Sequence, residues 1–140
     1  GRRVRALIEP IGFETSSLRH LAEAAEAIEA VGGDGRFGLV HDTFQHCIAG
    51  GGPICPAHTA IVHISGIPNA RVPLDSRLDA HRVFVDDADR CGTVAQIRNL
   101  LAAGYDGAFS FECTSAALTA LPDLKGAIAD SFAHIDAMTR

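Results

Sequence analysis

Short apolar runs alternate along this chain with segments whose apolar residues recur every three or four positions. The apolar runs predict strands at about residues 4–9, 37–42, 59–64 and 108–112. The helical spacing predicts helices at about residues 17–31, 44–49, 93–103 and 124–135. Because helices separate successive strands, the chain predicts repeated βα units, a parallel sheet and right-handed crossovers.

Local signals mark the ends of these elements. Gly32-Gly33 ends the first helix, because glycine readily adopts the left-handed conformation that follows a last helical turn. Thr93-Val94-Ala95-Gln96 has the spacing of a capping box and predicts that this motif opens the third helix. Residues 65–89 follow no period and carry many charges. A loop of that length in a compact domain is usually functional or mobile.

Each predicted strand ends with a side chain that can bind a divalent metal. These side chains are Glu9, Asp42, His63 and Glu112. Functional residues gather at the carboxyl ends of the strands both in a small doubly wound sheet and in part of a (β/α)8 barrel. Acids buried together repel strongly unless a cation neutralises them. We therefore predict a metal-dependent enzyme, with both architectures still open.

The same residues also have ordinary structural interpretations. Asp42 suits the N-cap of the helix that follows it, and His63 could be a buried histidine bonded to a backbone carbonyl. Glu9 and Glu112 could be acids in surface loops after strands. His41 points to the opposite face of its strand from Asp42, so we expect it to pack outward and not to bind metal.

Composition narrows the class of protein. The 140 residues are 47% hydrophobic, which is enough for one domain with a real core. The net charge of −5 argues against a nucleic-acid partner, since phosphate binding needs clustered Lys and Arg. No apolar run reaches the roughly 18 residues of a membrane span. Cys47, Cys55, Cys91 and Cys113 form no Cys-x-x-Cys pair, so we expect free thiols in a cytoplasmic protein.

Four motifs carry a resemblance to a known family. They are Leu7-Ile8-Glu9-Pro10-Ile11-Gly12-Phe13, His41-Asp42-Thr43-Phe44, Val62-His63-Ile64-Ser65 and Gly104-Tyr105-Asp106-Gly107-Ala108-Phe109-Ser110-Phe111-Glu112. In this order they resemble the second half of a xylose isomerase-like TIM barrel. That superfamily contains sugar and sugar-phosphate isomerases and epimerases, including enzymes of inositol catabolism. The resemblance implies strands five to eight of a (β/α)8 barrel.

The resemblance also implies a set of site residues. The family's ligands for Mn²⁺, Mg²⁺, Co²⁺ or Zn²⁺ match Glu9, Asp42, His63 and Glu112. It further implies substrate-binding roles for Arg82, Gln45 and His46. The family often has a histidine three residues after the strand-six aspartate, where this chain has Gln45 with His46 next. Gln45 could hydrogen-bond a substrate hydroxyl but cannot shuttle protons as an imidazole does.

These residues suit one type of reaction. Isomerising a sugar moves a proton on or off a carbon beside a carbonyl, and a bound metal stabilises the enediolate that forms. Two carboxylates can remove and return that proton, and Glu9 and Glu112 fit the pair. We therefore predict a metal-dependent isomerase or epimerase acting on a small sugar, sugar phosphate or keto-inositol. An inosose dehydratase-type lyase would use nearly the same parts.

The resemblance has consequences for length and partners. Such barrels run to about 250 residues, so we expect residues 1–140 to be a single domain and a fragment that lacks its amino-terminal half. The expected partners are a sugar or polyol substrate and either the missing half-barrel or a second copy of the chain.

Specific residues disfavour three other functions. An apurinic-site endonuclease of the related barrel class builds a multi-zinc centre from additional histidine and acidic residues. The modest charge of this chain and the missing histidine three residues after Asp42 count against it. A receiver-type signalling domain would need a lysine after a late strand, where this chain has Glu112-Cys113. An inactive binding module would leave the strand-end acids and histidine without a use.

Overall fold

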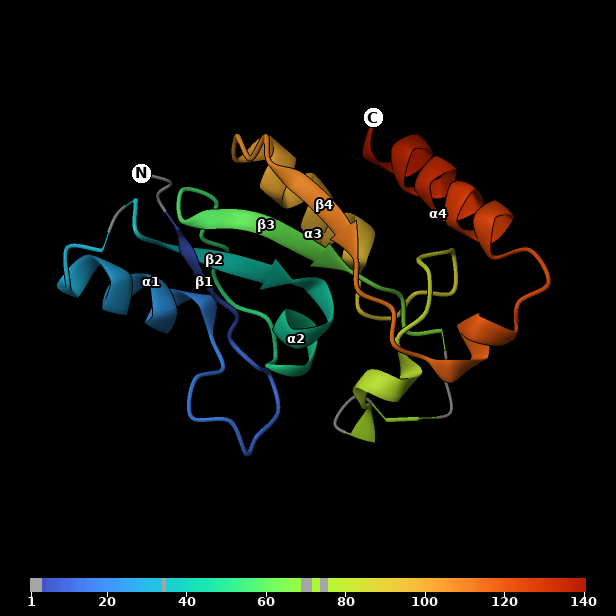
Figure 1. The fold of residues 1–140 in the computed structure, drawn as a ribbon, viewed down its shortest axis with the longest axis horizontal. Helices are drawn as coiled ribbons and strands as arrows, with labels where there is room; N and C mark the ends of the chain where they lie inside the picture. Colours follow the sequence, from blue (N-terminus) through green and yellow to red (C-terminus); the bar gives the residue numbers. More distant parts are fainter. Residues whose placement is uncertain (1–3, 34, 69–71, 74–75) are drawn as a thin grey trace.

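The computed structural model describes residues 4–33, 35–68, 72–73 and 76–140. Its strands are β1 Ala6–Ile8, β2 Phe37–Asp42, β3 Thr59–Ile64 and β4 Ala108–Phe111 (Figure 1). Its helices are α1 Leu21–Ala30, α2 Thr43–Ile48, α3 Thr93–Ala102 and α4 Leu124–Thr139, with short 3-10 turns η2 Asp79–His81 and η3 Ala116–Ala120. The predicted alternation of strands and helices is therefore confirmed.

The order of the strands decides between the two predicted architectures. The strands form one sheet in the order β1-β2-β3-β4, and each neighbouring pair is parallel. In a doubly wound sheet the order reverses at a switch point, which sends helices to both faces. A strictly sequential order with right-handed crossovers keeps the helices on one face, as in a (β/α)8 barrel. The chain thus forms half of a barrel wall, and the doubly wound alternative is excluded.

Three apolar clusters attach the helices to this wall. In the first, α1 packs against β2 through Leu21, Ala24, Ala25, Ile28 and Leu39. In the second, β3, α3 and α4 meet through Val62, Ile64, Val85, Ile97, Leu100, Tyr105 and Ile135. The third lies beside α2 and contains Phe44, Ile67 and Cys91. Because the first two clusters hold the strands from their helical side, the carboxyl ends of the strands lie at fixed positions along one rim.

The start of α3 corrects one prediction. Thr93 does not open a capping box, because the N-cap residue is Gly92, which has left-handed backbone and no side chain with which to cap the helix. The Thr93 hydroxyl instead donates to the Ser65 carbonyl at 2.9 Å, and Asp89 Oδ2 accepts from the Thr93 backbone N–H at 2.8 Å. The capping-box prediction is therefore wrong, since tertiary partners outcompete the local bonds of the motif.

The segment predicted as an irregular loop is partly ordered and partly buried. Gly66 and Val83 form an antiparallel bridge, and η2 lies between them in sequence. Residues 69–71 and 74–75 of this prediction lie outside the described residues. Arg77 and Arg82 are only 3% and 2% exposed, so two of the charged side chains in this segment lie in the interior and not on the surface.

Two composition-based expectations also meet the structure. All four cysteines are unpaired, as predicted. Across the described ranges, every helix falls short of the length or the apolar character that crossing a bilayer requires.

Candidate metal centre

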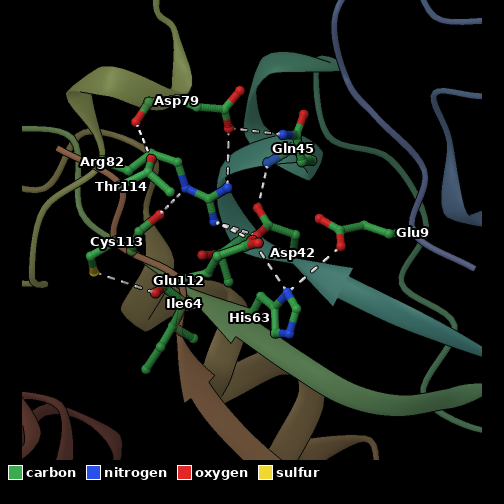
Figure 2. Close-up of polar contacts among 12 residues, drawn as sticks. Glu9, Asp42, Gln45, His63, Ile64, Asp79, Arg82, Glu112, Cys113 and Thr114 are labelled. Carbon is green, nitrogen blue, oxygen red and sulfur yellow. Dashed lines mark hydrogen bonds and ion pairs between the residues drawn. The ribbon is translucent and has the colours of Figure 1, made fainter. Parts of the chain in front are cut away.

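The four strand-end residues meet at the carboxyl rim of the sheet (Figure 2). Asp42 ends β2 and His63 lies near the end of β3, and the strand register makes the two residues direct Cα partners. Glu9 and Glu112 come directly after β1 and β4. One ligand atom from each of the four residues lies within 4.8 Å of the other three. The parallel register has therefore gathered side chains that are distant in sequence.

The ring of His63 lies between the two glutamates. Its Nδ1 atom is 3.2 Å from Glu112 Oε2 and 3.7 Å from Glu9 Oε2. Among the described residues, His63 Nδ1 is a buried atom that lacks a hydrogen-bond partner. Glu112 Oε2 faces it and also forms an ion pair with Arg82 Nη2 at 3.1 Å. A buried imidazole nitrogen that faces carboxylates without a hydrogen bond indicates a place for a cation.

Burial and neighbouring charges shift the pKa values of the three carboxyl groups in the cluster. Burial raises the pKa of Asp42 to about 7, although the charge of Arg82 and the backbone N–H of Gln45 oppose the rise. Burial and the charge of Glu112 raise the pKa of Glu9. Burial raises the pKa of Glu112, but a hydrogen bond with Asp42 and the charges of Arg82 and His63 lower it by more, so the net pKa is lowered. The cluster therefore retains a proton near neutral pH, which a divalent ion would displace.

Arg82 is the main positive charge at this cluster. Its Nη2 atom pairs with Asp42 Oδ2 and lies 3.1 Å from Glu112 Oε2. Nη1 pairs with Asp79 Oδ1 at 3.2 Å, and Nε donates to the Ser65 hydroxyl at 3.0 Å. Figure 2 shows Arg82 between Asp79, Asp42 and Glu112. The predicted substrate-binding role of Arg82 stays a prediction, because it requires release of at least one of these contacts.

Gln45 joins the loop after β1 to the start of α2. Its side-chain oxygen accepts from the Gly12 backbone N–H at 2.9 Å, and its side-chain nitrogen donates to Asp79 Oδ1 at 3.4 Å. Its own backbone N–H donates to Asp42 Oδ1 at 2.8 Å. Asp42 is thus both the N-cap of α2 and a member of the cluster, so its two predicted roles are compatible.

His46 lies against His41, with ring centroids 5.0 Å apart. His41 is fully buried, and its Nε2 atom is 2.9 Å from Gln96 Oε1 on α3, in keeping with the predicted outward packing. Burial and the neighbouring His41 and His20 lower the pKa of His46 to about 4. The substrate-binding roles of Gln45 and His46 therefore remain predictions, with structural contacts now assigned to both.

Comparison with known proteins places the chain in a family. The family model described as xylose isomerase-like TIM barrel matches residues 1–138. The chain belongs to this family. No curated protein matches it.

Three solved structures are similar to this xylose isomerase-like chain. A xylose isomerase domain-containing protein from Salmonella typhimurium LT2 is 26% identical to this chain, with a TM-score of 0.83. The match covers 96% of this chain and 50% of the Salmonella chain. An IolI protein with a bound zinc atom is 20% identical, with a TM-score of 0.78, and the match covers 97% of this chain and 49% of the IolI chain. A xylose isomerase domain protein from Alicyclobacillus acidocaldarius is 20% identical, with a TM-score of 0.76, and the match covers 96% of this chain and 50% of the Alicyclobacillus chain. The chain spans about half the length of each, which confirms the half-barrel.

The donor set of this xylose isomerase-like site fits a divalent metal ion. Three carboxylates and one imidazole offer hard oxygen ligands and one borderline nitrogen, a combination that suits Mg²⁺, Mn²⁺, Co²⁺ or Zn²⁺. His63 Nδ1, which lacks a hydrogen-bond partner, already faces Glu112 Oε2 in the described structure. The residues present can therefore hold such an ion without a new ligand from elsewhere.

Two residues around the cluster were missed by sequence reasoning. Ser65, whose hydroxyl accepts from Arg82, directly follows β3 and could have been found as one more polar residue at a strand end. Asp79 accepts from both Arg82 and Gln45. No local pattern sets Asp79 apart from the other acids of its loop. Asp79 also lines a cavity of about 600 Å³, together with Gly12 and Phe13.

Proposed function

We propose that this chain is the catalytic half of a divalent-metal-dependent isomerase or epimerase acting on a small sugar, sugar phosphate or keto-inositol. One observation carries the proposal. Glu9, Asp42, His63 and Glu112 direct ligand atoms to within 4.8 Å of one another at the rim where barrel enzymes bind substrates. The similar IolI protein binds a zinc atom, which supports a metal-binding role for this fold.

The two glutamates supply the acid–base chemistry in this proposal. A bound divalent ion would polarise the carbonyl of the substrate and so make the neighbouring C–H bond acidic. Glu9 and Glu112 stand on either side of His63, at 3.7 and 3.2 Å from its Nδ1 atom. One carboxylate removes the proton from carbon, and the other, on the opposite side of the substrate, returns one.

The half-barrel needs a second half to enclose a substrate. Each edge strand, β1 and β4, has one strand neighbour in the described sheet. The similar structures extend to about twice the length of this chain. We propose that residues 1–140 are one domain completed either by an amino-terminal half-barrel or by a second copy. The four free thiols fit a reducing compartment such as the cytoplasm.

A metal analysis combined with isotope exchange tests this function. We expect the full-length wild-type protein to carry about one divalent ion per site and to exchange substrate C–H protons with D₂O. Glu112→Gln should abolish the exchange, whereas Glu23→Gln on the exposed face of α1 should not. Wild-type protein without a bound ion, or full exchange in the Glu112 variant, would refute the proposal. Net loss of water from a keto-inositol would instead favour the dehydratase alternative.

The endonuclease alternative has its own discriminating measurement. An apurinic-site endonuclease would cleave abasic duplex DNA, and its affinity for DNA would fall steeply with salt. The net charge of −5 argues against that behaviour. We expect neither cleavage nor salt-dependent binding of the duplex.

A further inference from the structure

We propose that Arg82 is an internal counter-cation of the metal centre, which holds the ligand carboxylates together before a metal binds and then yields its contacts to the ion. This inference rests on the proposed function, because it requires a divalent ion at the four-residue cluster. It assigns Arg82 a positioning role that precedes any contact with substrate.

The guanidinium shares its partners with the metal. Nη2 pairs with Asp42 Oδ2 and lies 3.1 Å from Glu112 Oε2, so it links carboxylates at the ends of two different strands. Asp42 is fully buried, and two carboxylates so close repel strongly without a cation between them. A divalent ion at the same oxygens would meet the positive charge of Arg82 at close range. Metal and Nη2 therefore compete for these oxygens.

The remaining contacts of Arg82 do not involve the proposed ligands. Nε donates to the Ser65 hydroxyl at 3.0 Å, and Nη1 pairs with Asp79 at 3.2 Å. The guanidinium carbon lies 5.0 Å from the centroid of the Phe44 ring. These three anchors can keep the side chain in place when a metal takes over Asp42 and Glu112. Nη2 then faces the cluster with free N–H groups, which suit a substrate oxygen.

Thermal unfolding of the full-length protein tests the competition. Wild type, Arg82→Met and Arg82→Lys are each compared in a chelator and in saturating Mn²⁺, at about pH 8.5, where protons compete least with the ion. We expect Arg82→Met to lower the melting temperature of the metal-free protein far more than that of the Mn²⁺-loaded protein. The affinity of Arg82→Met for Mn²⁺ should rise by at least about tenfold. Arg82→Lys retains the charge but loses part of the guanidinium's contacts, so both its melting temperature and its Mn²⁺ affinity should lie between those of Arg82→Met and wild type.

Arg77→Met is the matched control. Arg77 is also buried, at 3% exposure, but its side chain bonds to the Val72 carbonyl at 3.3 Å and the Cys91 sulfur at 3.9 Å. Its loss should lower the stability of the metal-free and metal-loaded protein equally. The rise in melting temperature on Mn²⁺ addition should therefore match that of wild type.

Separate results would overturn the inference and the proposed function. Suppose that wild type binds Mn²⁺ but that Mn²⁺ raises the melting temperature of Arg82→Met by the same amount as that of wild type, or by less. Arg82 is then merely structural and the inference fails. If wild type binds no divalent ion, the proposed function itself fails. Should Arg82→Met not fold, arginine side-chain NMR of wild type decides. Mn²⁺ is then replaced by diamagnetic Mg²⁺, which should shift one buried guanidinium signal and leave that of Arg77 in place, whereas two unshifted signals would contradict the inference.

Discussion

The Nδ1 atom of His63 lies 3.2 Å from Oε2 of Glu112, without a hydrogen bond between them. The two residues come from neighbouring strands, since β3 pairs with β4 in parallel and His63 is the Cα partner of Ser110. The pleat places Ser110 and Glu112 on the same face of the sheet. The imidazole and the carboxylate therefore aim at one point from two adjacent strand ends.

Removing the imidazole should weaken metal binding. We expect His63→Gln to lower the affinity for Mn²⁺ or Zn²⁺ by more than about tenfold, because loss of a direct ligand exceeds typical outer-shell effects. Isothermal titration calorimetry of the full-length protein measures the change. His134→Gln is the control, since that ring faces Asp87 at 3.7 Å and contributes nothing to the cluster. Equal affinities in the two variants would rule out His63 as a ligand.

Metal and protons should compete at Asp42. Its pKa is 3.8 in an ordinary carboxyl and about 7 here, so the folded protein keeps a proton that the unfolded chain releases. The contribution of Asp42 to the stability of the metal-free protein should therefore fall as pH rises from about 4 to about 7, and then level off. The affinity for a divalent ion should rise over the same window. Calorimetry in buffers of different ionisation enthalpy should detect proton release near pH 6, and its absence there would contradict the assignment.

His46 should make the fold sensitive to acid. Its pKa falls from 6.5 to about 4 on folding, so the unfolded chain takes up a proton that the folded protein refuses. The contribution of neutral His46 to the free energy of unfolding is fully present above about pH 6.5 and is lost as pH falls toward 4. Denaturant unfolding should show that His46→Gln gains stability relative to wild type as pH falls from about 6.5 to about 4, because the variant lacks the group that resists protonation. His134→Gln should keep the slope of wild type; identical slopes in all three proteins would show that His46 titrates normally.

Gln45 should contribute to stability through Gly12. Gln45→Leu leaves the buried Gly12 N–H without its acceptor and should lower the free energy of unfolding by about 1–3 kcal/mol. Glu26→Gln on the exposed face of α1 should change it by less than about 0.5 kcal/mol. Chemical denaturation measures both. Unchanged stability in Gln45→Leu, together with weaker substrate binding, would favour the role in substrate recognition.

Close packing at Gly12 offers a complementary test of the same contact. A Cβ atom there would lie 2.1 Å from the Gln45 carbonyl oxygen and 2.9 Å from the Ala49 nitrogen. Gly12→Ala should therefore push the loop after β1 away from α2, at a cost of about 1–3 kcal/mol. Glu9 precedes this loop, so affinity for Mn²⁺ should also fall. Wild-type stability in Gly12→Ala would show that the loop adapts freely.

Much of the fold follows from local pattern. The bounds of β2 and β3 match the predicted runs 37–42 and 59–64, because continuous apolar runs of that length suit strands buried on both faces. The start of α1 was less predictable. It begins at Leu21, not near Ser17, because Ser16 and Leu18 form a turn through the Ser16 side chain. Boundaries of this kind depend on side-chain bonds that periodicity does not describe.

By itself the sequence determined the βα alternation and the four strand-end residues, because both follow from short-range spacing and from the rule that parallel strands end at one rim. Only the tertiary structure decided the sequential strand order and the 4.8 Å cluster. It also revealed that Arg82 lies buried between Asp42, Glu112 and Asp79. Such contacts depend on how a long segment folds back over the rim. The free energy of burying charges together decides that path, and no repeat along the chain encodes it.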